Sequence, residues 1–189
     1  MIDFKALSPV LTFFAHPDDE TLAAGATIKK MTNMGIEVVA AIPATGIFSR
    51  KEINSESKGN EELLKLRKDC VKALDILGIK SDSIFMGEFS DNEMDKHSLL
   101  ELIHWVENII LKVKPGLVLT HHRFCTNIDH QYCHNAAVVA TRPSINNHIS
   151  LLAGEVPSST GYLKPTMWEP NFYVNVNKSE INSKISAME

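Results

Sequence analysis

The chain has 189 residues, of which 44% are hydrophobic and 22% charged, and its formal net charge is −4. This size and composition are typical of a globular protein with a sizeable core, so we expect a single domain over residues 1–189. The acidic balance and the lack of basic runs argue against nucleic acid as a partner. The sequence shows no signal-peptide pattern, no apolar run that could span a membrane and no paired spacing of its 3 cysteines, so we expect a cytoplasmic protein without disulfides.

Apolar runs alternate with helical patterns along the chain, which is typical of a parallel sheet with crossover helices. The apolar runs predict strands over residues 10–15, 36–44, 83–87, 117–120 and 171–176. The helical patterns predict helices over residues 21–34, 60–77, 97–113, 131–141 and 178–189. We predict loops over residues 45–58, 88–95 and 144–170, the first of which is long enough to be a binding loop or a lid.

The first predicted turn carries the sequence Ala-His-Pro-Asp-Asp-Glu over residues 15–20, between a strand and a helix. Acidic residues favour the positive end of a helix, but that preference does not account for a histidine at the end of the strand. Because His16 and Asp19 are three residues apart, one turn can direct both side chains at one point, as a bound zinc ion requires. Asp18 projects between them and could take a proton from a bound water.

A second polar stretch, residues 121–130, lies between the fourth predicted strand and the next helix. Open α/β sheets bind ligands at the carboxyl ends of their strands, where this stretch and the first turn would meet. His130 is the natural third metal ligand at that edge. Asp129 or the pair His121 and His122 could contact the ligands without touching the metal, and we also count Asp129 among the candidate catalytic residues.

Two further polar residues suggest a substrate pocket. Asp91 follows the third predicted strand and would lie at the same edge of the sheet. Arg67 falls near the centre of the apolar stripe of the predicted helix over residues 60–77. Its charged head would either reach water past that stripe or point into a polar pocket with an anionic or hydroxyl-rich partner, and both explanations stay open.

These residues resemble the LmbE/PIG-L family of zinc-dependent N-deacetylases, which act on N-acetylated amino-sugar conjugates. The resemblance covers nearly the whole chain, and its most specific motifs are His-Pro-Asp-Asp-Glu over residues 16–20 and Asn-Ile-Asp-His over residues 127–130. Arg67, the Ser-Asp-Asn loop over residues 90–92 and Glu-Val-Pro-Ser-Ser-Thr over residues 155–160 also match. The resemblance implies an α/β fold with a Rossmann-like, mostly parallel sheet and helices on both faces.

The resemblance also implies a metal site and a mechanism. Zn²⁺ would be bound by His16, Asp19 and His130, and Asp18 would be the general base. Zinc with three protein ligands and an open position lowers the pKa of its bound water to about 7, which amide hydrolysis can use.

The substrate side of the resemblance rests on three residues. Arg67 and Asp91 would hold sugar hydroxyls or an attached anionic group, and Asn127 is a third candidate substrate-binding residue. Many family members carry a histidine at the position of Asn127, which can donate a hydrogen bond but no proton, so Asp18 would serve as both base and acid. Related chains usually continue past this C-terminus, so we expect either a short member or a truncated chain with an incomplete pocket wall.

The expected function is therefore removal of an acetyl group from an N-acetylglucosamine-like sugar, either a small molecule or a glycolipid, in glycan or lipopolysaccharide biosynthesis. The alternatives are a deacetylase of a glucosaminyl thiol precursor and a non-catalytic sugar-binding protein on the same fold. A nucleotide-binding domain fits less well, because the first turn lacks a Gly-x-Gly-x-x-Gly run. The sequence specifies neither the aglycone nor the oligomeric state.

Overall fold

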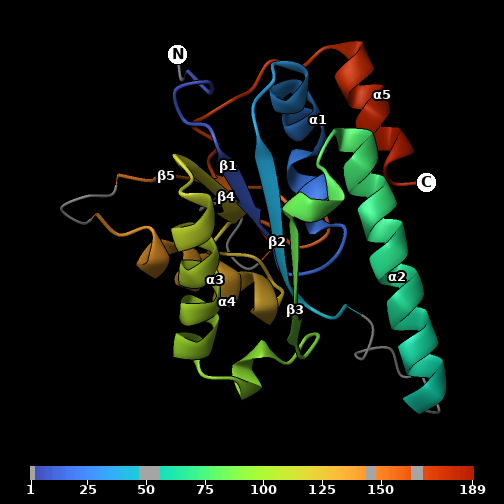
Figure 1. Ribbon diagram of the computed structural model, residues 1–189. Coiled ribbons are helices and arrows are strands. Elements are labelled where there is room, and N and C mark those ends of the chain that lie inside the picture. Colours follow the sequence, from blue (N-terminus) through green and yellow to red (C-terminus); the bar gives the residue numbers. More distant parts are fainter. Residues whose placement is uncertain (1–2, 47–55, 144–147, 163–167) are drawn as a thin grey trace.

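The computed structural model describes residues 3–46, 56–143, 148–162 and 168–189, which form a parallel sheet with helices on both faces (Figure 1). The strand order is β3-β2-β1-β4-β5. The strands are β1 (Val10–Phe13), β2 (Val38–Ala44), β3 (Ile84–Phe89), β4 (Leu117–His121) and β5 (Ser150–Gly154). The helices are α1 (Asp19–Asn33), α2 (Glu56–Leu77), α3 (Leu99–Val113), α4 (Ile128–Ala140) and α5 (Lys178–Ser186), with short 3₁₀ turns at Ser81–Ser83 and Met94–Lys96. The expected α/β fold class is confirmed.

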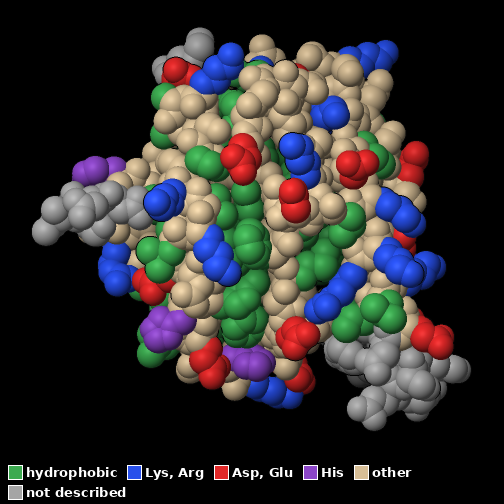
Figure 2. Space-filling model, in the orientation of Figure 1, with side chains coloured by type: hydrophobic (Ala, Val, Ile, Leu, Met, Phe, Trp, Pro, Cys, Tyr) green, Lys and Arg blue, Asp and Glu red, His purple; other side chains and the backbone are tan. Residues whose placement is uncertain are grey.

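The central strands are apolar on both sides because helices cover both faces of the sheet. α1 and α2 cover the face on which Val10 and Val38 are buried, and α3 and α4 cover the face on which Leu11 and Val39 are buried (Figure 1). α5 packs against α1 and α2. The edge strand β3 is less covered, and Figure 2 shows hydrophobic side chains in the furrow between α3 and α2, where this strand lies.

Side-chain caps determine where two helices begin. Ser98 Oγ accepts a hydrogen bond from Glu101 N at 3.2 Å and the Glu101 carboxylate accepts one from Ser98 N, a capping box that starts α3. Asn127 Oδ1 accepts a hydrogen bond from Asp129 N at 2.8 Å, so α4 begins at Ile128 rather than at residue 131. The first turn of α4 therefore holds Asp129 and His130 rigidly.

Two predictions about the C-terminal third were wrong. The range 144–170 was expected to be a loop, yet it contains β5, which pairs with β4 in parallel register. The range 171–176 was expected to be a strand, yet the structure has no strand there. Phe172 and Val174 pack against the core while Tyr173 is 78% exposed, so the extended chain alternates like a strand without joining the sheet. Most of the predicted loop over residues 45–58 lies outside the described residues, and α2 begins at Glu56.

The topology brings the polar turns to one edge of the sheet. β1 lies between β2 and β4. The chain places β2 and β3 on one side of β1 and then β4 and β5 on the other side. A crevice opens where the strand order reverses in this way. The turns that follow all five strands reach this edge. Within the described residues, no helix combines the length and the apolar character that a membrane crossing demands.

Candidate metal centre

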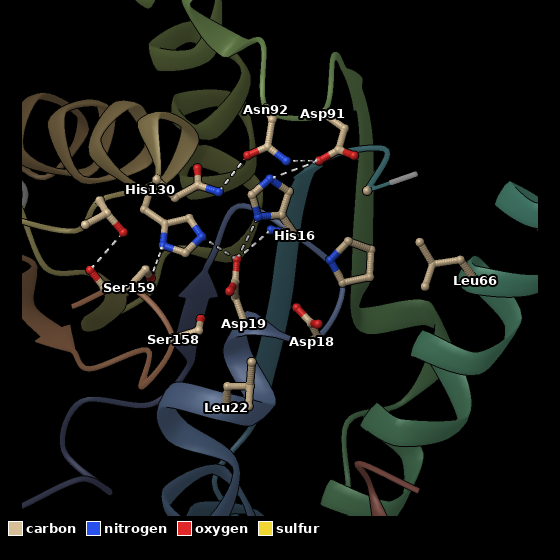
Figure 3. Close-up of a pocket in the computed structure, with 14 residues that line it drawn as sticks. His16, Asp18, Asp19, Leu22, Leu66, Asp91, Asn92, His130, Ser158 and Ser159 are labelled. Carbon is tan, nitrogen blue, oxygen red and sulfur yellow. Dashed lines mark hydrogen bonds and ion pairs between the residues drawn. The ribbon is translucent and has the colours of Figure 1, made fainter. Parts of the chain in front are cut away.

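A cavity of about 500 Å³ opens at the carboxyl ends of the strands (Figure 3). It draws residues from five separate turns and from α2, and the residues around it include His16, Asp18, Asp19, Leu66, Asp91, Asn92, Asn127, His130, Ser158 and Ser159. The cavity is mostly polar, and its size is that of a small-ligand pocket. The two sequence motifs therefore meet at one site.

His16, Asp19 and His130 converge on the floor of this cavity. Asp19 Oδ2 lies 3.0 Å from His16 Nδ1 and 3.1 Å from His130 Nε2, and one ligand atom from each residue falls within 4.8 Å of the others. Asp19 Oδ2 also accepts a hydrogen bond from His16 N at 3.0 Å, which holds the turn closed. Two imidazole nitrogens and one carboxylate oxygen form a donor set that suits a zinc ion.

A second group of potential ligands, His121, Cys125 and His130, has unsuitable geometry. The His121 and His130 rings are stacked, with centroids 3.8 Å apart and planes 14° apart. The lone pairs of two stacked rings lie in nearly parallel planes and therefore do not converge on one ion. His121 Nε2 moreover accepts a hydrogen bond from Ala15 N at 2.7 Å, so this buried ring packs behind the site.

A third group, His16, Asp91 and Asp129, is held by other interactions. The Asp129 carboxylate accepts hydrogen bonds from the backbone N–H groups of Asn92 at 2.6 Å and Met94 at 3.0 Å. Its Oδ2 also lies 2.9 Å from His16 Nε2, on the opposite side of the ring from Asp19. Asp129 thus fixes the His16 ring and leaves Nδ1 directed at Asp19.

Ser159 fixes the other histidine. Its Oγ lies 3.2 Å from His130 Nδ1, which directs Nε2 of that ring toward Asp19. Ser159 lies in the matched stretch over residues 155–160, but no chemical pattern in the sequence had identified a role for it.

Burial and ion pairing shift the pKa values of the candidate ligands. Burial alone would lower the pKa of His16, but its hydrogen bonds with Asp129 and Asp19 outweigh burial and raise this pKa from 6.5 to about 10. Burial would raise the pKa of Asp19, yet hydrogen bonds with His130 and His16 hold it well below its usual value. Without metal the site is an ion pair, and a metal ion has to displace the proton of His16.

Asp18 lies beside this trio in a strained backbone conformation. Its φ of 132° is in a region that L-residues other than glycine rarely adopt. Figure 3 shows its carboxylate at the cavity next to Asp19. The buried Glu20 carboxylate accepts hydrogen bonds from Asp18 N at 3.3 Å and from Thr21 Oγ1 at 2.8 Å, and burial raises the pKa of Glu20 to about 7.

A chain of amides connects the remaining polar residues of the cavity. Asn127 Nδ2 donates a hydrogen bond to Asn92 Oδ1 at 2.7 Å, and Asn92 Nδ2 donates one to Asp91 Oδ1 at 3.2 Å. Asp91 Oδ1 lies 3.3 Å from His16 Nε2. Asp91 and Asn127 thus line the cavity, and Asn92 connects them.

Arg67 and His122 occupy other positions. Arg67 Nη2 donates a hydrogen bond to the carbonyl of Gly87 on β3 at 3.0 Å, and its neighbour Leu66 faces the cavity instead. Arg67 is absent from the cavity lining that the described residues form. The His122 ring packs against Trp168, with centroids 4.8 Å apart, and faces a different hollow.

Comparisons with known proteins agree with this geometry. Residues 11–141 match the family model described as PIG-L: GlcNAc-PI de-N-acetylase. A diacetylchitobiose deacetylase from Thermococcus kodakarensis is 29% identical over 192 residues, covering 93% of this chain and 68% of the relative. A probable N-acetyl-alpha-D-glucosaminyl L-malate deacetylase 2 from Bacillus cereus is 32% identical over 114 residues, covering 60% of this chain and 51% of the relative, so the chain spans about half of that protein.

The fold is shared with solved structures of related enzymes. The N,N'-diacetylchitobiose deacetylase from Pyrococcus horikoshii superposes with a TM-score of 0.75 and 22% identity, covering 95% of this chain and 67% of that one. The family match spans both sequence motifs and all three residues of the candidate metal trio. The chain is therefore a member of the PIG-L family of de-N-acetylases.

Proposed function

We propose that this protein is a zinc-dependent hydrolase that removes the acetyl group from an N-acetylated amino sugar. The observation that carries the proposal is the convergence of His16, Asp19 and His130 at the floor of an open cavity. The family match and the deacetylase relatives support the same reaction.

Zinc fits the donor atoms of this site. When bound by three protein ligands with a fourth position open, zinc polarises a carbonyl and lowers the pKa of a bound water to about 7. Asp129 and Ser159 are positioning residues, because they hold the two imidazoles in the orientation that the trio requires. Asp129 had been counted among the candidate catalytic residues, and its hydrogen bonds favour this positioning role.

Asp18 is the proposed general base. Its carboxylate lines the cavity beside the trio and could accept a proton from the attacking water. The Asn127 amide carries no titratable proton, and its two ends are engaged by Asp129 N and Asn92 Oδ1. We therefore assign to Asp18 the return of the proton to the leaving amine as well.

Asp91 and the second N–H group of Asn127 Nδ2 are the proposed contacts for sugar hydroxyls, because both residues line the cavity. For Arg67 we favour a structural role, since its guanidinium binds the carbonyl of Gly87 beside the irregular pairing of β2 with β3. The pathway could be glycan or lipopolysaccharide biosynthesis, and the substrate could be a glycolipid or a thiol precursor. Both choices depend on which aglycone the sugar carries.

The proposal is tested by measuring acetate release from a panel of N-acetyl sugars beside the zinc content of the same preparation. We expect release by the wild type and loss of both zinc and activity in His130→Ala. His104→Ala is the matched control, because His104 is an exposed histidine on α3, remote from the cavity lining. Sugar binding without acetate release would favour the non-catalytic alternative, and a full equivalent of zinc in His130→Ala would show that the metal site is misassigned.

A further inference from the structure

A second cavity, also of about 500 Å³, adjoins the metal site. It lies between the beginning of α1, the middle of α2 and the end of α5, and we call it the α2–α5 cavity. Pro17, Asp18 and Leu66 line both cavities. Figure 3 shows Leu66 projecting from α2 with Asp18 between it and Asp19, so these residues lie at the boundary between the two cavities.

The wall of the α2–α5 cavity is largely apolar. Cys70, Ala73 and Ile76 line it from α2, and Ala187 and Met188 line it from the end of α5. The two helices lie side by side in Figure 1. Ile76 is 39% exposed, so a large apolar side chain borders the hollow without being covered. Exposed apolar side chains grouped around a hollow are typical of a ligand-binding surface.

The charges around this cavity exclude an anionic ligand. Its lining carries the carboxylates of Asp18, Glu20, Asp69 and Glu189. The ammonium of Lys72 is held 2.9 Å from Asp69, and the described lining residues supply no further lysine or arginine. A phosphate or a carboxylate placed here would face four carboxylates and the single ammonium of Lys72, which is already paired with Asp69.

The Glu20 carboxylate does not need a hydrogen-bond donor from a ligand. Its carboxylate is buried and already accepts hydrogen bonds from Thr21 Oγ1 and Asp18 N. A group that fills the α2–α5 cavity therefore gains most from apolar contact with the two helices.

We propose that the α2–α5 cavity binds the aglycone of the substrate, and that this aglycone is an uncharged alkyl or aryl group. The inference rests on the proposed deacetylase function. In an N-acetylglucosaminide the aglycone is attached to the carbon next to the one that bears the acetamide. In the pose that we propose, the acetamide reaches the metal trio and the aglycone points past Asp18, across the boundary that Pro17 and Leu66 line.

The test uses a series of 2-acetamido-2-deoxyglucosides with methyl, butyl, hexyl and octyl aglycones, each below its micelle concentration. Burial of one methylene group changes an equilibrium constant by up to about fourfold. We expect KM to fall about two- to fourfold for each methylene group that enters the cavity, with kcat unchanged. An aglycone of the same length that ends in a carboxylate should show no such gain.

Ala73→Phe fills the cavity and should remove the dependence of KM on chain length, while the kinetics of the methyl glycoside and the zinc content stay unchanged. Leu64→Phe is the matched control, because Leu64 lies on the same helix, is 60% exposed and lines neither cavity. Met188→Glu places a charge at the rim and tests the same surface if the Phe variant folds poorly.

Calorimetric binding of the octyl and methyl glycosides to the metal-free protein separates this inference from the proposed function. Tighter binding of the octyl compound, weakened in Ala73→Phe or Met188→Glu, would support the cavity assignment even if no acetate were released. Equal affinity across the series, an unchanged chain-length effect in both variants, or preference for the carboxylate-ended aglycone would overturn it.

Discussion

The backbone of Asp18 provides a sharp test of how the candidate base is held. At φ 132° this residue carries strain of about 1–3 kcal/mol, which glycine would not experience. Glycine also increases the entropy of the unfolded chain, at a cost of about 0.5–1 kcal/mol relative to alanine. Asp18→Gly should therefore be more stable than Asp18→Ala, by up to about 2.5 kcal/mol.

The comparison with Asp18→Ala matters because both variants remove the carboxylate beside Asp19. Any change in electrostatic repulsion is therefore common to both, and the difference reports the backbone alone. For a chain of this size, about 2.5 kcal/mol corresponds to about 5–10 °C in melting temperature, which is the upper limit of the expected difference. Thermal unfolding of the metal-free proteins, followed by circular dichroism and calorimetry, measures that difference.

Asp18→Asn keeps the size and the strain of the wild type but loses the basicity. It should retain zinc and should not gain the stability that Asp18→Gly gains from relief of the backbone strain. Its deacetylation rate should fall by a factor of about 10²–10⁴. Asp18→Gly should be the most stable of the three variants and equally inactive. If Asp18→Gly melts at or below the temperature of Asp18→Ala, the strain argument is wrong, and if Asp18→Asn loses zinc, Asp18 is a ligand instead of a base.

Three further predictions concern the surroundings of the metal site. Asp129→Asn should weaken zinc binding about 10–100-fold in a chelator competition, because the His16 ring loses its carboxylate partner; unchanged affinity would contradict the positioning role. Because the pKa of His16 is raised from 6.5 to about 10 in the metal-free protein, its contribution to stability is present below pH 6.5 and is lost as the pH rises through 10. Zinc must displace that proton, so zinc affinity should rise about tenfold per unit between pH 6.5 and 8, and a pH-independent affinity would refute the ion pair. Arg67→Ala should lower the melting temperature and leave KM nearly unchanged. A large increase in KM without loss of stability would show that Arg67 binds the substrate.

The sequence alone determined the local chemistry of the site. An apolar strand followed by His16, Pro17 and two aspartates specifies a tight turn into a helix, because each residue favours its position there for local reasons. The alternation of apolar runs and helical patterns specified a parallel sheet, and a parallel sheet brings the turns after its strands to one edge. The predicted metal trio follows from these local features.

Tertiary structure alone decided which extended segment joins the sheet and which contacts the polar residues make. Residues 171–176 alternate between partly buried and exposed side chains. Such periodicity indicates which side of a segment is covered and carries no information on backbone pairing. β5 is an edge strand and is only partly buried, so its apolar pattern is weak. Asp129 and Arg67 could each have faced a substrate, and their partners, His16 and the carbonyl of Gly87, belong to distant segments. Contacts between segments far apart in the chain depend on how the layers pack, which no local pattern encodes.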